Sequence, residues 1–175
     1  MESIRNSYAY QRIDLERKEI RLLELLPGER EDKVRVRLRH ASLDAEPRYD
    51  ALSYMWGDPS VTRSIQLDDS NKFQVTVNLE NALRDLRLID RSMILWVNAV
   101  CINQGDIEER NHQVQLMQAI YQGASVVRAW LDIEIDPECP AFARFARLDQ
   151  ESTEDELSNN VEFWEPVTRI SKDPY

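Results

Sequence analysis

The chain has 175 residues, 42% of them hydrophobic and 31% charged, and a formal net charge of -10. This length suits about one domain, whose core needs neither a metal nor disulfides to be stable. The acidic balance argues against binding nucleic acid through its phosphates, and no stretch is apolar for long enough to predict a membrane span. We therefore expect a soluble, cytoplasmic protein without nucleic-acid or membrane partners.

The two cysteines, Cys101 and Cys139, give no disulfide framework. That usage is typical of a reducing compartment, and the N-terminus lacks the apolar segment of a signal peptide. Most of the excess negative charge lies in residues 131–175.

The first predicted strand covers residues 33–43, where valines and a leucine alternate with Arg35, Arg37 and Arg39. This period of two indicates one buried and one solvated face. The three arginines form a basic stripe, interpreted as the solvated face, with an anion-binding surface as the alternative. A hairpin is predicted next, with strands at residues 63–69 and 72–77 and a turn at Asp68-Asp69-Ser70-Asn71.

Asn78 is a suitable N-cap for a helix that runs to about Leu88 with Leu79, Ala82, Leu83 and Leu86 on one face. Residues 93–97 follow as a strand buried on both faces.

A second helix is predicted from residues 107–109 to Gly123. Its apolar face is expected to hold Val114, Met117, Tyr121 and Ala124. Residues 125–131 read as another buried strand, and this alternation predicts a parallel sheet covered by helices. Beyond Asp132, residues 142–148 and 161–170 are candidate helices around an acidic, polar stretch.

Two apolar segments each end abruptly in polar residues, and we expect the functional site there. They are Tyr49–Asp58 and Leu95–Gln104. If both are strands of one parallel sheet, their carboxyl ends lie side by side and their polar ends face one shared cleft.

Each polar feature has a structural and a functional interpretation. Trp56-Gly57-Asp58 is either a tight turn or a ligand contact, and Asp58 is the best candidate for a catalytic acid. Asn103 and Gln104 either hold the loop before the second helix or bind a ribose or base.

For other candidate residues, a structural role is favoured over a functional one. Cys101 lies in an apolar run without a nearby base, so a core thiol is favoured over a nucleophile. Glu109 and Arg110, with Gln113, open the second helix; a salt bridge of Arg110 with Asp106 is favoured over a ligand-binding arginine.

No metal site is predicted, because His40 and His112 lack ligand spacing. No phosphate-binding glycine loop, dinucleotide fingerprint or Cys-x-x-Cys pair occurs either, so no cofactor is expected. Trp96 and Trp130 are expected on neighbouring strands, as core aromatics.

In sum, the candidate functional residues are Ser53, Tyr54, Trp56, Gly57, Asp58, Trp96, Asn98, Asn103, Gln104, Glu109, Arg110 and Gln113.

Several motifs resemble the fungal heterokaryon incompatibility (HET) domain. They are Tyr49-Asp-Ala-Leu-Ser-Tyr-Met-Trp-Gly-Asp58, Asn78-Leu-Glu-Asn-Ala-Leu83, Leu95-Trp-Val-Asn-Ala-Val-Cys-Ile-Asn-Gln104, Glu109-Arg110 with Gln113-Val114, and Trp130-Leu131. The preceding stretch, with Glu19-Ile-Arg-Leu-Leu23 and Pro27-Gly28, also resembles what precedes that domain. The resemblance divides the chain into a leader with strands that pack on the domain, residues 1–48, and a HET domain, residues 49–175.

The resemblance implies an effector of fungal non-self recognition that triggers programmed cell death. It also implies a fold like that of Toll/interleukin-1 receptor (TIR) domains, a flavodoxin-like parallel sheet flanked by helices, here with an N-terminal β-hairpin extension. Some TIR domains cleave NAD, so NAD is a candidate substrate. Protein partners or self-association are the corresponding expectation for a signalling module.

Two departures bear on the enzymatic alternative. Asn98 stands where the family usually has Asp, and a neutral amide cannot act as a base. The chain also ends before the family's Trp-rich motif with Gln-Glu, the expected place of a TIR-type catalytic carboxylate. We therefore expect a truncated HET domain in which residues 1–175 alone do not cleave NAD.

Overall fold

The structure is a computed structural model that describes residues 8–68 and 71–131. The helices expected within residues 142–148 and 161–170, and the acidic stretch between them, lie outside the described residues. No helix in the described ranges is long and apolar enough to cross a membrane.

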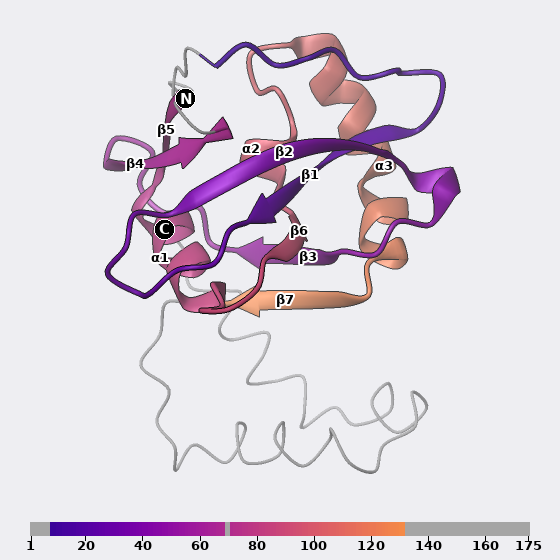
Figure 1. Ribbon diagram of the computed structural model, residues 1–175. Coiled ribbons are helices and arrows are strands. Elements are labelled where there is room, and N and C mark those ends of the chain that lie inside the picture. The colour runs from indigo at the N-terminus through magenta and orange to yellow at the C-terminus, as the bar shows by residue number, and fades with distance from the viewer. Residues whose placement is uncertain (1–7, 69–70, 132–175) are drawn as a thin grey trace, which may run out of the picture. The chain divides into compact units, whose positions relative to one another are not determined.

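The described chain forms an α/β fold whose elements follow each other in this order: β1 (Glu19–Leu25), β2 (Arg35–Ser42), the 3-10 turn η1 (Leu43–Ala45), β3 (Asp50–Tyr54), β4 (Thr62–Leu67), β5 (Asn71–Thr76), α1 (Val77–Leu86), β6 (Met93–Trp96), α2 (Asn98–Cys101), α3 (Ile107–Gly123) and β7 (Val126–Trp130). Figure 1 shows the strands as one sheet with the helices packed beside it.

The sheet has seven strands in the order β5-β4-β2-β1-β6-β3-β7, and it is mixed rather than parallel. β3 pairs in parallel with both β6 and β7, as expected for α/β units. β1 runs antiparallel to both β2 and β6. The prediction of a parallel sheet is thus only partly correct, because the hairpin of β1 and β2, expected as an N-terminal extension, lies in the middle of the sheet and makes it mixed.

β1 lies at the centre of the core. Six of its seven residues are buried, including the apolar Ile20, Leu23 and Leu25. Its neighbours β2 and β6 cover both edges, so the strand is enclosed on every side. The segment before Tyr49 thus belongs to the same sheet as the motifs that follow it.

The amphipathic strand and the hairpin are confirmed. Val36 in β2 and Val34 just before it are buried in the core, while Arg35, Arg37 and Arg39 are exposed. Arg39 of β2 forms an ion pair with Glu24 of β1 at 2.5 Å, so this arginine of the exposed face also links the two strands. β4 and β5 pair antiparallel as predicted.

α1 is confirmed, with Leu79, Ala82 and Leu83 buried, but its predicted cap is wrong. Thr76 is the N-cap, and its hydroxyl accepts a hydrogen bond from the Leu79 N–H at 3.4 Å. Asn78 instead donates to the carbonyl oxygen of Met55 at 3.1 Å and so ties α1 to the end of β3.

The apolar segment from Leu95 ends earlier than expected. β6 stops at Trp96, and residues 98–101 form the single helical turn α2. Asn103 and Gln104 therefore follow a helical turn and not a strand. The backbone N–H groups of Val100 and Cys101 bond to the Val97 carbonyl oxygen and close this turn.

α3 begins at Ile107 as predicted, with Asp106 as its N-cap. Met117, Tyr121 and Ala124 of the predicted apolar face pack against the core, but Val114 does not. Glu109, Gln113 and Ile120 point inward, whereas Val114 is 54% exposed. The prediction of Val114 on the apolar face is wrong, because polar side chains occupy the buried face near the start of the helix.

β7 is a strand as predicted, but it is not buried. Among the described strands it forms one edge of the sheet (Figure 1). Its residues Val126 and Val127 are exposed. β3 lies between β6 and β7, so Trp96 and Trp130 are not on neighbouring strands. Trp96 is fully buried, whereas Trp130 is partly buried and donates its indole N–H to Asp85 at 3.0 Å.

The turn after β3 depends on Gly57, whose φ is +71° and whose added Cβ would lie 2.9 Å from the Asn78 side chain. We predict that Gly57→Ala lowers the free energy of unfolding by about 1–3 kcal/mol in urea denaturation. Gly105→Ala is the matched control, because its Cβ would meet only Asn103 at 3.4 Å. Equal stability of the two variants would contradict this account of the turn.

Candidate functional site

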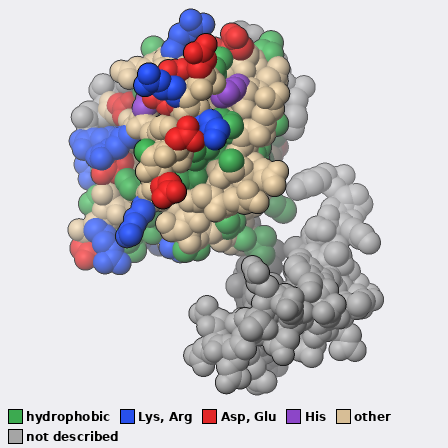
Figure 2. Space-filling view, turned by 90° about the vertical axis from the view of Figure 1, so that its right-hand side faces the viewer, with side chains coloured by type: hydrophobic (Ala, Val, Ile, Leu, Met, Phe, Trp, Pro, Cys, Tyr) green, Lys and Arg blue, Asp and Glu red, His purple; other side chains and the backbone are tan. Residues whose placement is uncertain are grey.

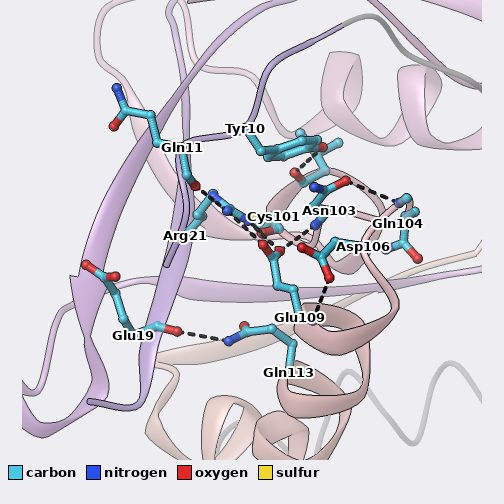
Figure 3. A network of polar contacts seen from close by, with 12 residues as sticks. Tyr10, Gln11, Glu19, Arg21, Cys101, Asn103, Gln104, Asp106, Glu109 and Gln113 are labelled. Atoms are coloured by element: carbon cyan, nitrogen blue, oxygen red, sulfur yellow. Dashed lines mark hydrogen bonds and ion pairs between the residues drawn. The ribbon is translucent and has the colours of Figure 1, made fainter. Parts of the chain in front are cut away.

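A buried ion pair between β1 and α3 is the centre of the polar network in Figure 3. Arg21 Nη1 lies 2.6 Å from Glu109 Oε1, and Nη2 lies 3.0 Å from Oε2. The two side chains are 1% and 6% exposed. This bidentate arrangement is the strongest geometry for an arginine–carboxylate pair.

Backbone carbonyls and one aromatic ring complete the surroundings of Arg21. Nη1 also donates to the carbonyl oxygen of Cys101 at 3.2 Å, and Nη2 donates to that of Gln11 at 2.5 Å. The guanidinium carbon lies 4.8 Å from the centre of the Tyr10 ring, within cation–π range. The Tyr10 hydroxyl donates to the Val100 carbonyl oxygen at 2.9 Å, so it holds α2 as well.

Glu109 connects this arginine to the loop between α2 and α3. Its Oε1 accepts a hydrogen bond from the Asn103 N–H at 2.7 Å, while its own N–H is bound to the N-cap carboxylate of Asp106 at 3.1 Å. Both carboxylate oxygens therefore have partners. A buried charge is tolerated only when it is paired and hydrogen-bonded in this way.

The amide side chains of the second motif contact their own loop. Gln104 donates to the carbonyl oxygen of Asn98 at 2.9 Å, and Asn103 Oδ1 accepts from the Gly105 N–H at 3.2 Å. Gln113, one turn after Glu109, donates to the carbonyl oxygen of Glu19 at 2.9 Å (Figure 3). These contacts hold the loop and α3 on β1; ligand contact by Asn103 and Gln104 stays a prediction.

The first motif forms a separate turn at the end of β3. Asp58 accepts from both the N–H and the hydroxyl of Ser60, at 2.8 and 2.7 Å. These hydrogen bonds lower the pKa of the fully exposed Asp58 carboxyl. Asp58 is thus an anion that closes a turn, and a lowered pKa does not suit a general acid. Ser53, Trp56 and Gly57 are exposed beside it.

The sheet brings the two motif strands together, but their polar ends have different partners. β3 and β6 are adjacent and parallel, with Ala51 opposite Trp96, as predicted. The end of β3 is bonded to α1. The loop after α2 is bonded to α3, which is in turn bonded to β1. Apart from the backbone pairing of β3 with β6, no side-chain hydrogen bond among the described residues joins the polar end of one motif to that of the other, so the shared cleft stays a prediction.

Aromatic side chains pack where β3 and β6 end. Trp96 is fully buried, and its ring lies 5.6 Å from that of Tyr121 in an edge-to-face arrangement. The Tyr121 hydroxyl donates to the Leu52 carbonyl oxygen at 3.4 Å, and burial raises the pKa of Tyr54.

The side-chain oxygen of Asn98, Oδ1, is buried without a hydrogen bond among the described residues. Burying a neutral amide there costs less free energy than burying a carboxylate would.

Cys101 is a core thiol, as favoured from the sequence. Its Sγ accepts from the Val97 N–H at 3.3 Å, and burial raises its pKa to about 12. His40 lies 3.2 Å from Glu19, apart from the motifs. Within the described ranges, no three His, Cys, Asp or Glu side chains are grouped to hold a metal ion.

The predicted salt bridge of Arg110 is replaced by a different one. Arg110 is exposed, and its backbone N–H bonds to the Asp106 carbonyl oxygen, while the buried carboxylate of Glu109 pairs with Arg21. Sequence reasoning missed both Arg21 and Tyr10 as site residues. A signal for Arg21 was present, because it is a charged residue between the apolar residues Ile20, Leu22 and Leu23.

Comparison with known proteins agrees with the motif resemblance. The sequence profile described as Heterokaryon incompatibility protein (HET) matches residues 49–175. The chain belongs to the HET family. It is similar to Heterokaryon incompatibility protein 6, OR allele, of Neurospora crassa, with 33% identity over 169 residues that cover 88% of this chain. The alignment spans 25% of that relative, so this HET chain is about a quarter of its length. No solved structure matches significantly.

Breaking the buried pair should destabilise this HET domain strongly. We predict that Arg21→Met lowers the free energy of unfolding by about 3–5 kcal/mol, because Glu109 stays buried without a cation. Lys18→Met is the control, since the Lys18–Asp44 pair is 57% and 62% exposed; it should cost less than about 1 kcal/mol. Similar losses for both variants in chemical denaturation would contradict a special role for Arg21.

The Cys101 thiol should be unreactive in the folded protein, because a thiol with a pKa of about 12 holds almost no thiolate at pH 8. In a Cys139→Ser background, we predict that iodoacetamide labels Cys101 only after denaturant is added, as followed by mass spectrometry. Rapid labelling at pH 8 without denaturant would show that the thiol is accessible.

Proposed function

We propose that this HET chain is an effector module of fungal vegetative incompatibility, which acts in the cytoplasm and triggers programmed cell death through contacts with protein partners. Membership of the HET family and the similarity to an incompatibility protein of Neurospora crassa support the role in incompatibility. The death-signalling step and the protein partners are part of the proposal.

One observation favours a module over an enzyme. The motif carboxylates are already used within the fold: Glu109 is paired with Arg21 and bonded to the loop, and Asp58 closes a turn with Ser60. A catalytic carboxylate must reach the reacting atoms. In the described motifs, the carboxylates of Glu109 and Asp58 therefore have structural roles.

The exposed part of the first motif suits a protein contact. Trp56 is 42% exposed on a turn that is held by the Asn78–Met55 hydrogen bond and by Gly57. Exposed tryptophans on rigid segments are frequent anchors of protein interfaces. On the side of the molecule that Figure 2 shows, acidic and basic side chains are interspersed, so this side is not the basic surface that binding of nucleic acid requires.

The alternative is a TIR-like enzyme that cleaves NAD. Its support is the parallel pairing of β3 with β6 and β7, since α/β sheets bind ligands beyond the carboxyl ends of such strands. Under this alternative NAD is the substrate and Asp58 is the candidate acid within the described motifs. The catalytic glutamate would come from the Gln-Glu motif of the family.

Induced expression of the 175-residue chain in a fungal host tests the proposal. We predict loss of viability, with killing reduced several-fold by Trp56→Ala, because an interface anchor is removed. Ile89→Ala is the control, since Ile89 is also exposed but lies outside the motifs.

Purified chain incubated with NAD should release no nicotinamide. Full viability on expression of the folded chain would contradict the effector role. Nicotinamide release that Asp58→Asn abolishes would instead establish the enzymatic alternative.

A further inference from the structure

β7 leaves one edge of the sheet unpaired within the part of the chain that the structure describes. On its inner side all five residues pair with β3, from Asp50 opposite Val126 to Tyr54 opposite Trp130. Its outer side is the end of the strand order. An edge of this kind presents backbone N–H and C=O groups that can pair with another strand.

β7 also lacks the features that usually protect an edge. Val126 and Val127 are 47% and 51% exposed, and the strand contains no proline, lysine or interruption of its register. Its only charged residue, Arg128, is bound through Nε to Asp50 Oδ2 of β3 at 2.7 Å. The charge is thereby compensated within its own sheet.

The opposite edge of the sheet is built differently. β5 carries Lys72 on its exposed side, while its large apolar residues Phe73 and Val75 are buried in the core. A lysine on an edge strand discourages pairing with another chain. The contrast within one molecule marks β7, and not β5, as the edge available for association.

We propose that β7 pairs antiparallel with β7 of a second copy of this chain, which joins the two sheets across a two-fold axis. A two-fold contact uses the same patch twice, so pairing of all five residues puts Arg128 at the axis, with Val127 of one copy opposite Ala129 of the other. Because Asp50 compensates Arg128 in each copy, no uncompensated like charges meet across the axis. This inference rests on the proposed role as an interaction module and gives that role a surface.

The pairing should be weak and concentration-dependent. A contact between two five-residue strands is smaller than the roughly 1,200 Å² that stable protein interfaces bury. Weak association suits a module that signals only when copies are brought together, because tethering raises the effective concentration. The chain therefore dimerises when it is crowded and stays monomeric when it is dilute.

Sedimentation velocity of the purified 175-residue chain over a concentration series tests the dimer. The wild type should show a reversible monomer–dimer equilibrium, and Val127→Lys should weaken it by roughly tenfold or more by placing one additional positive charge on each side of the axis. Val114→Lys is the matched control, because Val114 is similarly exposed but lies on α3. A monomer at every concentration, or equal weakening by both variants, would overturn the proposal.

Hydrogen exchange on the same samples gives a second readout that does not depend on a variant. The β7 amides on the outer edge should become protected as concentration rises. Protection that is independent of concentration would mean that the chain itself covers β7, and would also overturn the proposal. Killing in the fungal assay without dimerisation would contradict this inference but not the proposed function. Dimerisation without killing would contradict the proposed function but not this inference.

Discussion

The bidentate ion pair between Arg21 and Glu109 is the constraint on which the HET motifs depend. Arg21 projects from the central strand β1 and contacts the carbonyl oxygens before β1 and at the end of α2. Glu109 projects from the first turn of α3 and holds the loop backbone at Asn103. Moving any one of these segments would leave a charge buried without its partner, which is far more costly than losing an exposed pair.

The leader, residues 1–48, contributes strands to the same sheet as the motifs. The HET profile begins at Tyr49, yet β1 and β2 lie in the same sheet as the strands after that residue, and β1 pairs directly with β6. The second motif is positioned by Arg21 and Tyr10, which both precede the profile match. The leader is therefore part of the structure that presents the motifs, and a HET protein that lacked it would expose an edge of β6.

Much of the fold could be predicted because its local patterns are strong. The alternation in β2, the hairpin of β4 and β5, and the apolar spacing of α1 each reflect burial of one face, which sequence periodicity records directly. The helix α3 was found for the same reason. Of its predicted apolar face only Val114 was misassigned, because Glu109 and Gln113 are polar residues on the buried side, and hydrophobic periodicity assigns such residues to solvent.

The antiparallel position of β1 and the partner of Glu109 could not be predicted, because both depend on contacts between residues far apart in the chain. Arg21 and Glu109 are separated by 88 positions, and neither spacing nor composition links them. The cap of α1 was misplaced by two residues, since Thr76 and Asn78 are both good caps. Only the packing of Asn78 against the end of β3 distinguishes them.

A double-mutant cycle on Arg21→Met and Glu109→Gln, followed by chemical denaturation, tests this account most directly. If the pair links β1 to the motif loop, the double variant should be less destabilised than the sum of the single variants, with a coupling of about 2–3 kcal/mol. Single effects that add to within about 0.5 kcal/mol would show that the two residues act independently, and would contradict the central role given to their ion pair.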